Sequence, residues 1–265
     1  MQNKTESEEL LTVGEHLEIL RKLLFKVLFV FLISTIIIFC FKKEVFSIIL
    51  APKSSNFISF QLITNFVRLF SPNFSFEPYN IQLISTEASS QFMSHIYVSC
   101  ILGLLISSPF ILYQLLKYIS PALYENEKKY SSRLVFIIFF LFFLGVLISY
   151  YILFPVSFRF LATYSVDESI SNMITLDSYI STFASLTFMT GIVFQLPIIS
   201  FVLGKMGILN SNILVKWRPY AIITIMIIAA IITPPDIFTL IIISIPIYGL
   251  YELSIIVLKR HSRNI

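Results

Sequence analysis

The stretch from Arg218 to Glu252 constrains the fold most, because it holds two apolar runs joined by the turn Thr233-Pro234-Pro235-Asp236. A helix from Tyr220 to Thr233 would reach only about 21 Å at about 1.5 Å per residue, whereas the hydrocarbon core of a bilayer is about 30 Å thick. We therefore interpret both runs as short membrane helices. Since unpaired backbone groups cannot face lipid, such helices must pack against longer ones and thin the bilayer around them.

The composition indicates a membrane protein. Hydrophobic residues make up 57% of the chain, charged residues only 13%, and the mean hydropathy is +0.86. Soluble domains carry about one quarter charged residues. The first eighteen residues contain five glutamates and lack the basic start of a cleaved secretory signal, so we expect the first apolar helix to be retained. Cys40 and Cys100 fall in or beside apolar runs, which favours small buried residues over a disulfide.

The long apolar runs predict an all-α polytopic membrane protein with six transmembrane helices, of which the last two are short. The predicted spans are Leu23–Phe41, Gln91–Leu116, Leu134–Phe154, Tyr179–Leu203, Arg218–Thr233 and Ile237–Leu258. This arrangement divides the chain into a cytoplasmic amphipathic segment over residues 1–22, a transmembrane domain over 23–258 and a basic cytoplasmic tail over 259–265.

The distribution of basic residues predicts the orientation. With both termini inside, fourteen basic residues lie inside and five outside, which together make the nineteen Lys and Arg of the chain. Basic residues concentrate on the cytoplasmic side of membrane proteins, so we expect both termini in the cytoplasm. Topology thus explains the positive charge, and a nucleic-acid partner is not expected. The longer outer segment, Lys42 to Ser90, predicts an irregular cap with a short amphipathic helix around Phe57 to Phe70.

The residues of catalytic and metal sites are missing from the sequence. His16, His95 and His261 lie far apart without metal-ligand spacing, and neither a Gly-rich phosphate loop nor a hydrolase motif is present. Seven glycines and isolated intramembrane polar residues give no selectivity filter and no relay of buried acids. We therefore expect binding surfaces rather than an enzyme, with no cofactor and no metal.

Two polar residues inside the spans need partners. Glu252 lies toward the cytoplasmic end of the last run, where it either contacts a partner or sits at the interface beside Lys259 and Arg260. Gln195 lies in mid-span, two residues before Pro197, which bends the helix and frees a carbonyl. Its amide can hold helices of the same chain together or bond a partner helix, and the residues alone support both roles.

Two cytoplasmic segments carry acids at the membrane surface. The first is Gly14 to Arg21, in which Glu18 is also placed to pair with Lys22 one turn later. The second is Ser120 to Lys129, which contains Glu125 and Glu127. Acids from both segments could hold a pair of guanidinium groups by charge-assisted, bidentate bonds. The alternative is that they are solvated surface charges.

Taken together, these segments resemble TatC, the large polytopic subunit of the twin-arginine protein translocase, from about Glu15 to Arg260. Each motif is short, but the motifs occur in order and at matching spacing within six spans. The matching segments are His16-Leu17-Glu18-Ile19-Leu20-Arg21, Ser108-Pro109-Phe110-Ile111-Leu112-Tyr113-Gln114, Pro121-Ala122-Leu123-Tyr124 with Glu127, Phe194-Gln195-Leu196-Pro197, Arg218-Pro219-Tyr220, Thr233-Pro234-Pro235-Asp236, and Ile245-Pro246 through Tyr251-Glu252.

The resemblance implies a receptor for folded proteins that carry a twin-arginine signal peptide, driven by the proton-motive force. It implies a multi-pass protein of a bacterial inner membrane, or of an organellar inner or thylakoid membrane. The implied partners are small single-span subunits of the TatA/TatB type, precursor proteins, membrane lipid and further copies of the chain.

The resemblance also implies roles for particular residues. The residues implied in signal-peptide binding are Glu127, Glu18, His16, Leu20, Arg21, Pro121, Leu123 and Tyr124. Those implied in docking partner helices are Gln195, Pro197 and Glu252. The implied structural turn is Pro234, Pro235 and Asp236. The family acid before Leu-Arg is Ile19 here, which leaves Glu18 as its substitute, about 100° away around a helix. Gln195 stands where many relatives have glutamate.

Two other functions are compatible with the residues. Six spans with Gln195 and Glu252 inside them would suit a secondary solute transporter, although no inverted repeat is evident. A membrane scaffold would tolerate charge reversal in both acidic segments. Selective binding of twin-arginine peptides separates the receptor from both.

Overall fold

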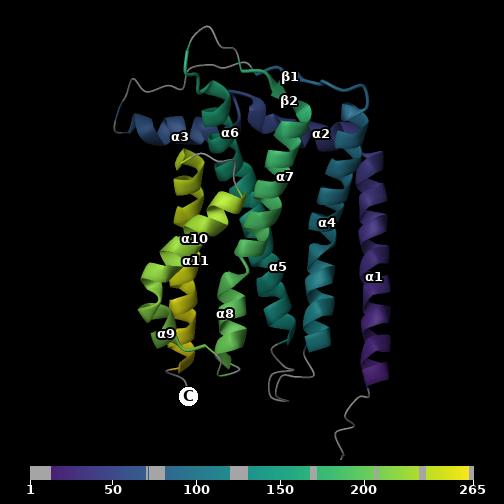
Figure 1. Ribbon diagram of the computed structural model, residues 1–265, viewed down its shortest axis with the longest axis vertical. Helices are drawn as coiled ribbons and strands as arrows, with labels where there is room; N and C mark the ends of the chain where they lie inside the picture. Colours follow the sequence, from purple (N-terminus) through teal and green to yellow (C-terminus); the bar gives the residue numbers. More distant parts are fainter. Residues whose placement is uncertain are drawn as a thin grey trace, which may run out of the picture.

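The computed structural model describes residues 13–69, 71, 81–119, 131–167, 172–205, 207, 209–232 and 237–262. Within these residues the chain is a bundle of upright helices with two short helices lying across one end (Figure 1). The first helix begins and the last helix ends at the opposite end of the bundle. We call that end the terminal face and the end covered by the short helices the distal face.

Six apolar helical segments are described, five of them long enough to cross a membrane. The long ones are Leu17–Cys40, Ser90–Gln114, Val135–Thr163, Leu176–Gly204 and Thr239–Arg260, and the shorter one is Arg218–Ile232. The helices that form these segments are α1 Val13–Cys40, α4 Ser90–Ile119, α5 Ser131–Ile148 with α6 Phe154–Thr163, α7 Leu176–Val193 with α8 Leu196–Lys205, α10 Arg218–Ile232 and α11 Ile237–Ser262. The short helix α9, Ser211–Lys216, lies between α8 and α10 in the chain. The predicted all-α membrane fold is confirmed.

The prediction that the last two spans are both short is wrong for the second of them. α10 has 15 residues, about 22 Å at about 1.5 Å per residue, but α11 has 26 residues and reaches about 39 Å. The apolar run Ile237–Leu258 by itself already covers about 33 Å at about 1.5 Å per residue, because Pro246 is tolerated in the helix interior and does not divide it, and α11 continues beyond the run to Ser262. The turn residues Pro234, Pro235 and Asp236 lie outside the described residues.

Prolines mark the irregular points of two other spans. A π-helical turn, Ser149–Leu153, joins α5 to α6 just before Pro155. α7 ends and α8 begins around Phe194 and Gln195, because Pro197 has no N–H to donate to the carbonyl of Val193. Both spans therefore bend without being interrupted.

The distal face is built from the segment between the first two spans. α2 (Lys42–Leu50) leads through a 3-10 turn, Ala51–Lys53, into α3 (Ile58–Arg68), and both helices lie across the bundle (Figure 1). A two-residue parallel pairing joins β1 (Leu83–Ile84) to β2 (Ile174–Thr175). The predicted amphipathic helix near Phe57 to Phe70 is confirmed as α3, whereas the sequence reasoning missed α2.

An aromatic core ties this distal layer to the upright helices. Phe154 and Phe158 of α6 meet the ring of Tyr179 of α7 edge-on, and Tyr179 is fully buried. The Tyr179 hydroxyl donates to the carbonyl of Ile49 over 2.7 Å, and the Tyr150 hydroxyl donates to the carbonyl of Ile48 over 2.8 Å. The end of α2 is thus held by two side chains from the bundle.

α1 stands at the edge of the bundle and packs mainly on α4 (Figure 1). The two helices approach closely where Gly103 faces Thr35. A Cβ on Gly103 would overlap the Thr35 hydroxyl oxygen and lie 2.9 Å from the Thr35 backbone. Gly103 is therefore required for this helix contact.

We predict that Gly103→Ala lowers stability by about 1–3 kcal/mol, because the added methyl group would force α1 away from α4. Gly249→Ala is the matched control, since it also lies inside a helix and a Cβ there meets nothing within 4 Å. The control should be neutral or slightly stabilising, as alanine favours helix more than glycine does. Thermal unfolding of both variants in detergent micelles measures the difference, and equal midpoints would contradict the packing argument.

Candidate functional site

The described part of the terminal face carries Glu18 on α1. Glu18 forms a 2.8 Å ion pair with Lys22 on the next turn, and both side chains are exposed. On α1 the residues that face α4 are half-buried, and they include Leu20, Leu23 and Val27. Because each residue turns a helix by about 100°, Glu18 lies about 200° from Leu20 and so faces away from α4. Arg21 is exposed beside it.

The structure leaves the other predicted signal-peptide residues untested. Glu127, Pro121, Leu123 and Tyr124 lie outside the described residues, as does the side chain of His16. The ion pair of Glu18 with Lys22 matches the spacing read from the sequence.

Gln195 lies at the bend between α7 and α8 and is buried. Its amide nitrogen donates to the carbonyl of Ile138 on α5 over 3.1 Å. Two glycines bring these helices together, since a Cβ on Gly145 or on Gly191 would lie 2.8 Å from the ring of Phe194 or of Phe142. Gln195 therefore holds two helices of the same chain together, and Pro197 beside it is also buried.

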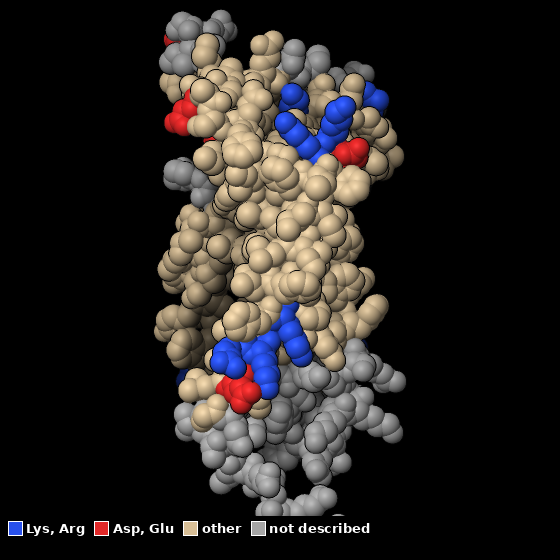
Figure 2. Space-filling model, turned by 90° about the vertical axis from the view of Figure 1, so that its right-hand side faces the viewer, with Lys and Arg blue, Asp and Glu red and all other residues tan. Residues whose placement is uncertain are grey.

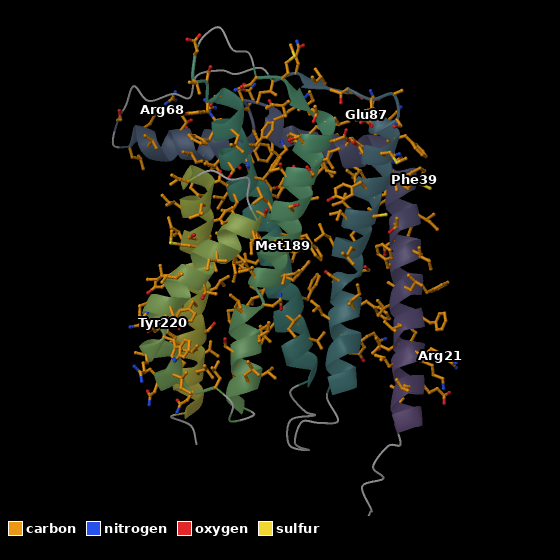
Figure 3. The ribbon with its side chains drawn as sticks, viewed as in Figure 1. Arg21, Phe39, Arg68, Glu87, Met189 and Tyr220 are labelled. Carbon is orange, nitrogen blue, oxygen red and sulfur yellow. The ribbon has the colours of Figure 1, made fainter. Side chains whose placement is uncertain are left out.

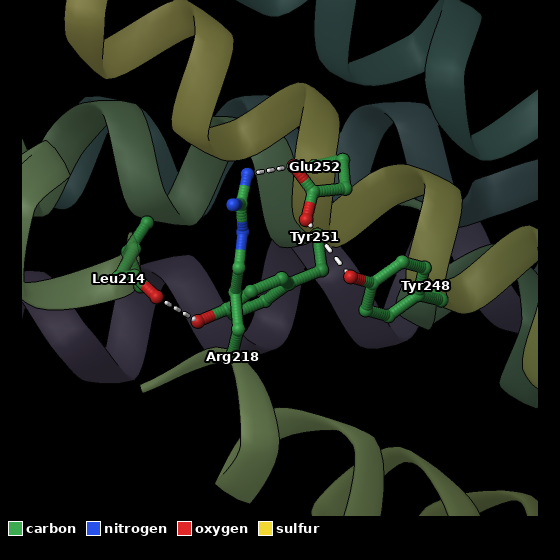
Figure 4. Close-up of polar contacts among 5 residues, drawn as sticks. All are labelled: Leu214, Arg218, Tyr248, Tyr251 and Glu252. Atoms are coloured by element: carbon green, nitrogen blue, oxygen red, sulfur yellow. Dashed lines mark hydrogen bonds and ion pairs between the residues drawn. The ribbon is translucent and has the colours of Figure 1, made fainter. Parts of the chain in front are cut away.

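Glu252 on α11 pairs with Arg218 at the start of α10. Its carboxylate accepts from the Arg218 guanidinium over 2.7 Å and from the Tyr248 hydroxyl over 3.0 Å (Figure 4). The neighbouring Tyr251 hydroxyl donates to the carbonyl of Leu214 on α9 over 2.7 Å. We call Arg218, Tyr248, Tyr251 and Glu252 the terminal clamp, because it joins α9, α10 and α11 near the terminal face.

The sequence reasoning assigned Glu252 to the interface or to an unidentified partner and missed Arg218. The sequence does contain a feature that predicts this pair, because Arg218 and Glu252 lie at equal separations from Pro235 along the chain. An antiparallel pair of helices around that turn places the two residues opposite each other. Among the described residues, no three His, Cys, Asp or Glu side chains gather closely enough to hold a metal ion.

We predict that Glu252→Ala and Arg218→Ala each lower the melting temperature of the purified protein, because each leaves the other charge without its partner. The double variant should lose less than the sum of the two single losses, since the second change removes a charge that is already unpaired. Arg260→Ala, at the exposed end of α11, is the control and should change little. Fully additive losses would show that the pair contributes nothing.

We also predict that Gln195→Leu lowers stability by about 1 kcal/mol, the usual size of a side-chain hydrogen bond between membrane helices. Gln91→Leu, at an exposed position of α4, is the matched control. Chemical unfolding in mixed micelles measures both changes. An unchanged Gln195→Leu protein would argue that the amide serves another role.

Comparisons of the sequence with known proteins all find the same family. The family model described as Sec-independent protein translocase protein (TatC) matches residues 15–246. The TatC of Blattabacterium sp. subsp. Periplaneta americana is 34% identical over 91% of this chain and 92% of its own length. The TatC of Carboxydothermus hydrogenoformans is 30% identical over 94% of this chain and 93% of its own length.

The fold has a match among solved structures. A crystal structure of the twin-arginine translocase receptor TatC superposes with a TM-score of 0.73 at 33% sequence identity, covering 94% of this chain and 100% of that one. A second crystal structure of the receptor, in the detergent DDM, gives a TM-score of 0.74 at the same identity.

Proposed function

The chain belongs to the TatC family of Sec-independent protein translocase proteins, and we propose that its terminal face receives the twin-arginine signal peptides of folded precursor proteins. As a member of that family it is a core subunit of the twin-arginine translocase and a multi-pass protein of a bacterial inner membrane. The likeness to the receptor over nearly the whole chain carries the proposal. The alternative of a secondary solute transporter gains no support from these likenesses.

The orientation follows from charge. Both the start of α1 and the end of α11 lie at the terminal face (Figure 1), and the positive-inside bias favours a cytoplasmic location for it. The distal face would then lie outside. Signal peptides synthesised in the cytoplasm would meet Glu18 and the segment from Pro121 to Glu127 on the same side of the membrane.

The two arginines of the signal need carboxylates. A carboxylate can accept two parallel bonds from one guanidinium, whereas lysine offers only a point charge, which gives a physical basis for selecting arginine. We assign the larger part of this binding to Glu127, because Glu18 faces away from α4 and already pairs with Lys22. His16, Leu20, Arg21, Pro121, Leu123 and Tyr124 would form the surroundings of the bound peptide.

The partners would meet the chain within the membrane. α10 exposes Ile223, Ile227 and Ile231, which recur every four residues and so form one apolar stripe. We propose that single-span subunits of the TatA/TatB type dock near this stripe, where the shortness of α10 thins the bilayer. Gln195 and Pro197, being buried, would shape the bend of α7 and α8, and Glu252 would keep α10 in place. Further copies of the chain would join the complex, which the proton-motive force would drive.

We predict that Glu127→Ala weakens binding of a twin-arginine signal peptide by at least tenfold, because a charge-assisted, bidentate contact with one guanidinium would be lost. Fluorescence anisotropy of a labelled peptide on the protein in lipid nanodiscs measures the dissociation constant. Glu87→Ala is the control, since Glu87 lies at the distal face (Figure 3). Equal affinity of both variants would count against the assigned site.

A further inference from the structure

A pocket opens between α1 and α4 on the half of the bundle nearer the terminal face. It has a volume of about 440 Å³, and its walls are apolar, with Arg21 contributing the aliphatic stem of its side chain. Leu28 and Phe31 line it from α1, and Leu104 and Ile111 line it from α4. None of these apolar residues belongs to the predicted signal-peptide site.

The pocket arises from how the two helices cross. α1 and α4 touch at Thr35 and Gly103, where not even a Cβ on the glycine would fit between them. From there they diverge toward the terminal face (Figure 1), and the pocket occupies the space that opens. Leu24, Phe25 and Leu28, which also line it, are exposed, so the pocket opens sideways along α1, with Arg21 at its terminal end.

The depth of the pocket matches one leaflet of a bilayer. Arg21 and Phe31 are ten residues apart on α1, about 15 Å at about 1.5 Å per residue. Half of a hydrocarbon core of about 30 Å is also about 15 Å. A pocket that starts at Arg21 and ends at Phe31 thus spans the depth of one layer of acyl chains.

The positive charge at the terminal end of the pocket suits an anion. Arg21 and Lys26 are exposed on α1, and Lys22 lies between them in its pair with Glu18. Figure 2 shows basic side chains gathered at both ends of this side of the molecule, with a broad uncharged belt between them. Figure 3 shows Arg21 near the terminal end of α1.

We propose that this pocket binds an anionic phospholipid of the cytoplasmic leaflet, with one acyl chain between α1 and α4 and the headgroup phosphate at Arg21. Basic pockets between membrane helices on the cytoplasmic side bind such headgroups. The assignment of the leaflet rests on the orientation in the proposed function. A bound lipid would fill the splayed end of the contact and hold the first turns of α1, which carry Glu18, at a fixed distance from α4.

The size of the pocket favours a lipid over the apolar helix of a signal peptide. A helix is about 10 Å across with its side chains, too wide to enter a gap that narrows to the contact of Thr35 with Gly103. A single acyl chain is much narrower than a helix. The signal peptide is nevertheless the competing occupant that the experiment must distinguish.

The test places a fluorescent reporter in the pocket. The chain has one tryptophan, so Trp217→Phe with Phe31→Trp leaves a single tryptophan at the end of the pocket farthest from Arg21. This protein is reconstituted in phosphatidylcholine nanodiscs that contain increasing fractions of phosphatidylglycerol with brominated acyl chains, which quench tryptophan on contact. We expect saturable quenching at low mole fraction, stronger than with brominated phosphatidylcholine at the same fraction.

Two pocket variants and their controls complete the test. Arg21→Gln should weaken the apparent affinity for phosphatidylglycerol about fivefold, whereas Lys42→Gln at the start of α2 should not. Leu104→Phe should fill the pocket and reduce the saturable quenching, whereas Ile106→Phe, on the exposed face of α4, should leave it unchanged.

Equal quenching by both brominated lipids, with no effect of Arg21→Gln, would overturn the proposal and indicate contact with bulk lipid only. Quenching by a signal peptide carrying a brominated side chain, without selective quenching by the anionic lipid, would also overturn it. The lipid experiment needs no precursor protein, so a negative lipid result would not count against the receptor function. In the same way, a failure to bind signal peptide would not count against lipid binding.

Discussion

The short helix α10 depends on its contacts with α11, since its 15 residues cover about 22 Å of a hydrocarbon core that is about 30 Å thick. Packing holds it along its length through Ile225, Ala229 and Ile232, and the terminal clamp fixes its first turn through the ion pair of Arg218 with Glu252. α11, at 26 residues, supplies the length that α10 lacks. The bilayer must therefore adapt on one side of the molecule, and this asymmetry would give the proposed single-span partners a distinct place to dock.

The opposite edge of the bundle is formed by α1, which is held in a different way. α1 contacts mainly α4, and the glycine at position 103 lets the two helices touch partway along their length, beyond which they separate toward the terminal face (Figure 1). The distal layer closes the other end, because Tyr179 and Tyr150 hold α2 by hydrogen bonds to its last carbonyls. The upright helices are thus held at the distal face, whereas the half of α1 nearer the terminal face is separated from α4 by the pocket.

Hydropathy alone predicted the membrane class, the positions of the six apolar segments and the amphipathic α3, because a membrane helix must be apolar over most of its length. It misjudged α11, because the apolar run Ile237–Leu258 forms one uninterrupted helix through Pro246 and is about 33 Å long, enough to cross the hydrocarbon core. The sequence analysis also left two roles open for Gln195 and missed the pairing of Arg218 with Glu252. Both contacts depend on which helices lie side by side, which hydropathy alone does not show. The pocket beside Arg21 was beyond sequence reasoning, since it results from the angle between two helices. The acid site at Glu127 remains a prediction from the motif.

The most direct test of the receptor account compares two signal peptides on the unmodified protein in lipid nanodiscs, one with its arginine pair and one with both arginines changed to lysine. The peptides carry the same charge, so simple electrostatic attraction would bind them equally, whereas bidentate carboxylate contacts favour arginine. The account predicts at least tenfold tighter binding of the arginine peptide. Equal dissociation constants would contradict it and leave the chain as a translocase subunit that does not itself read the signal.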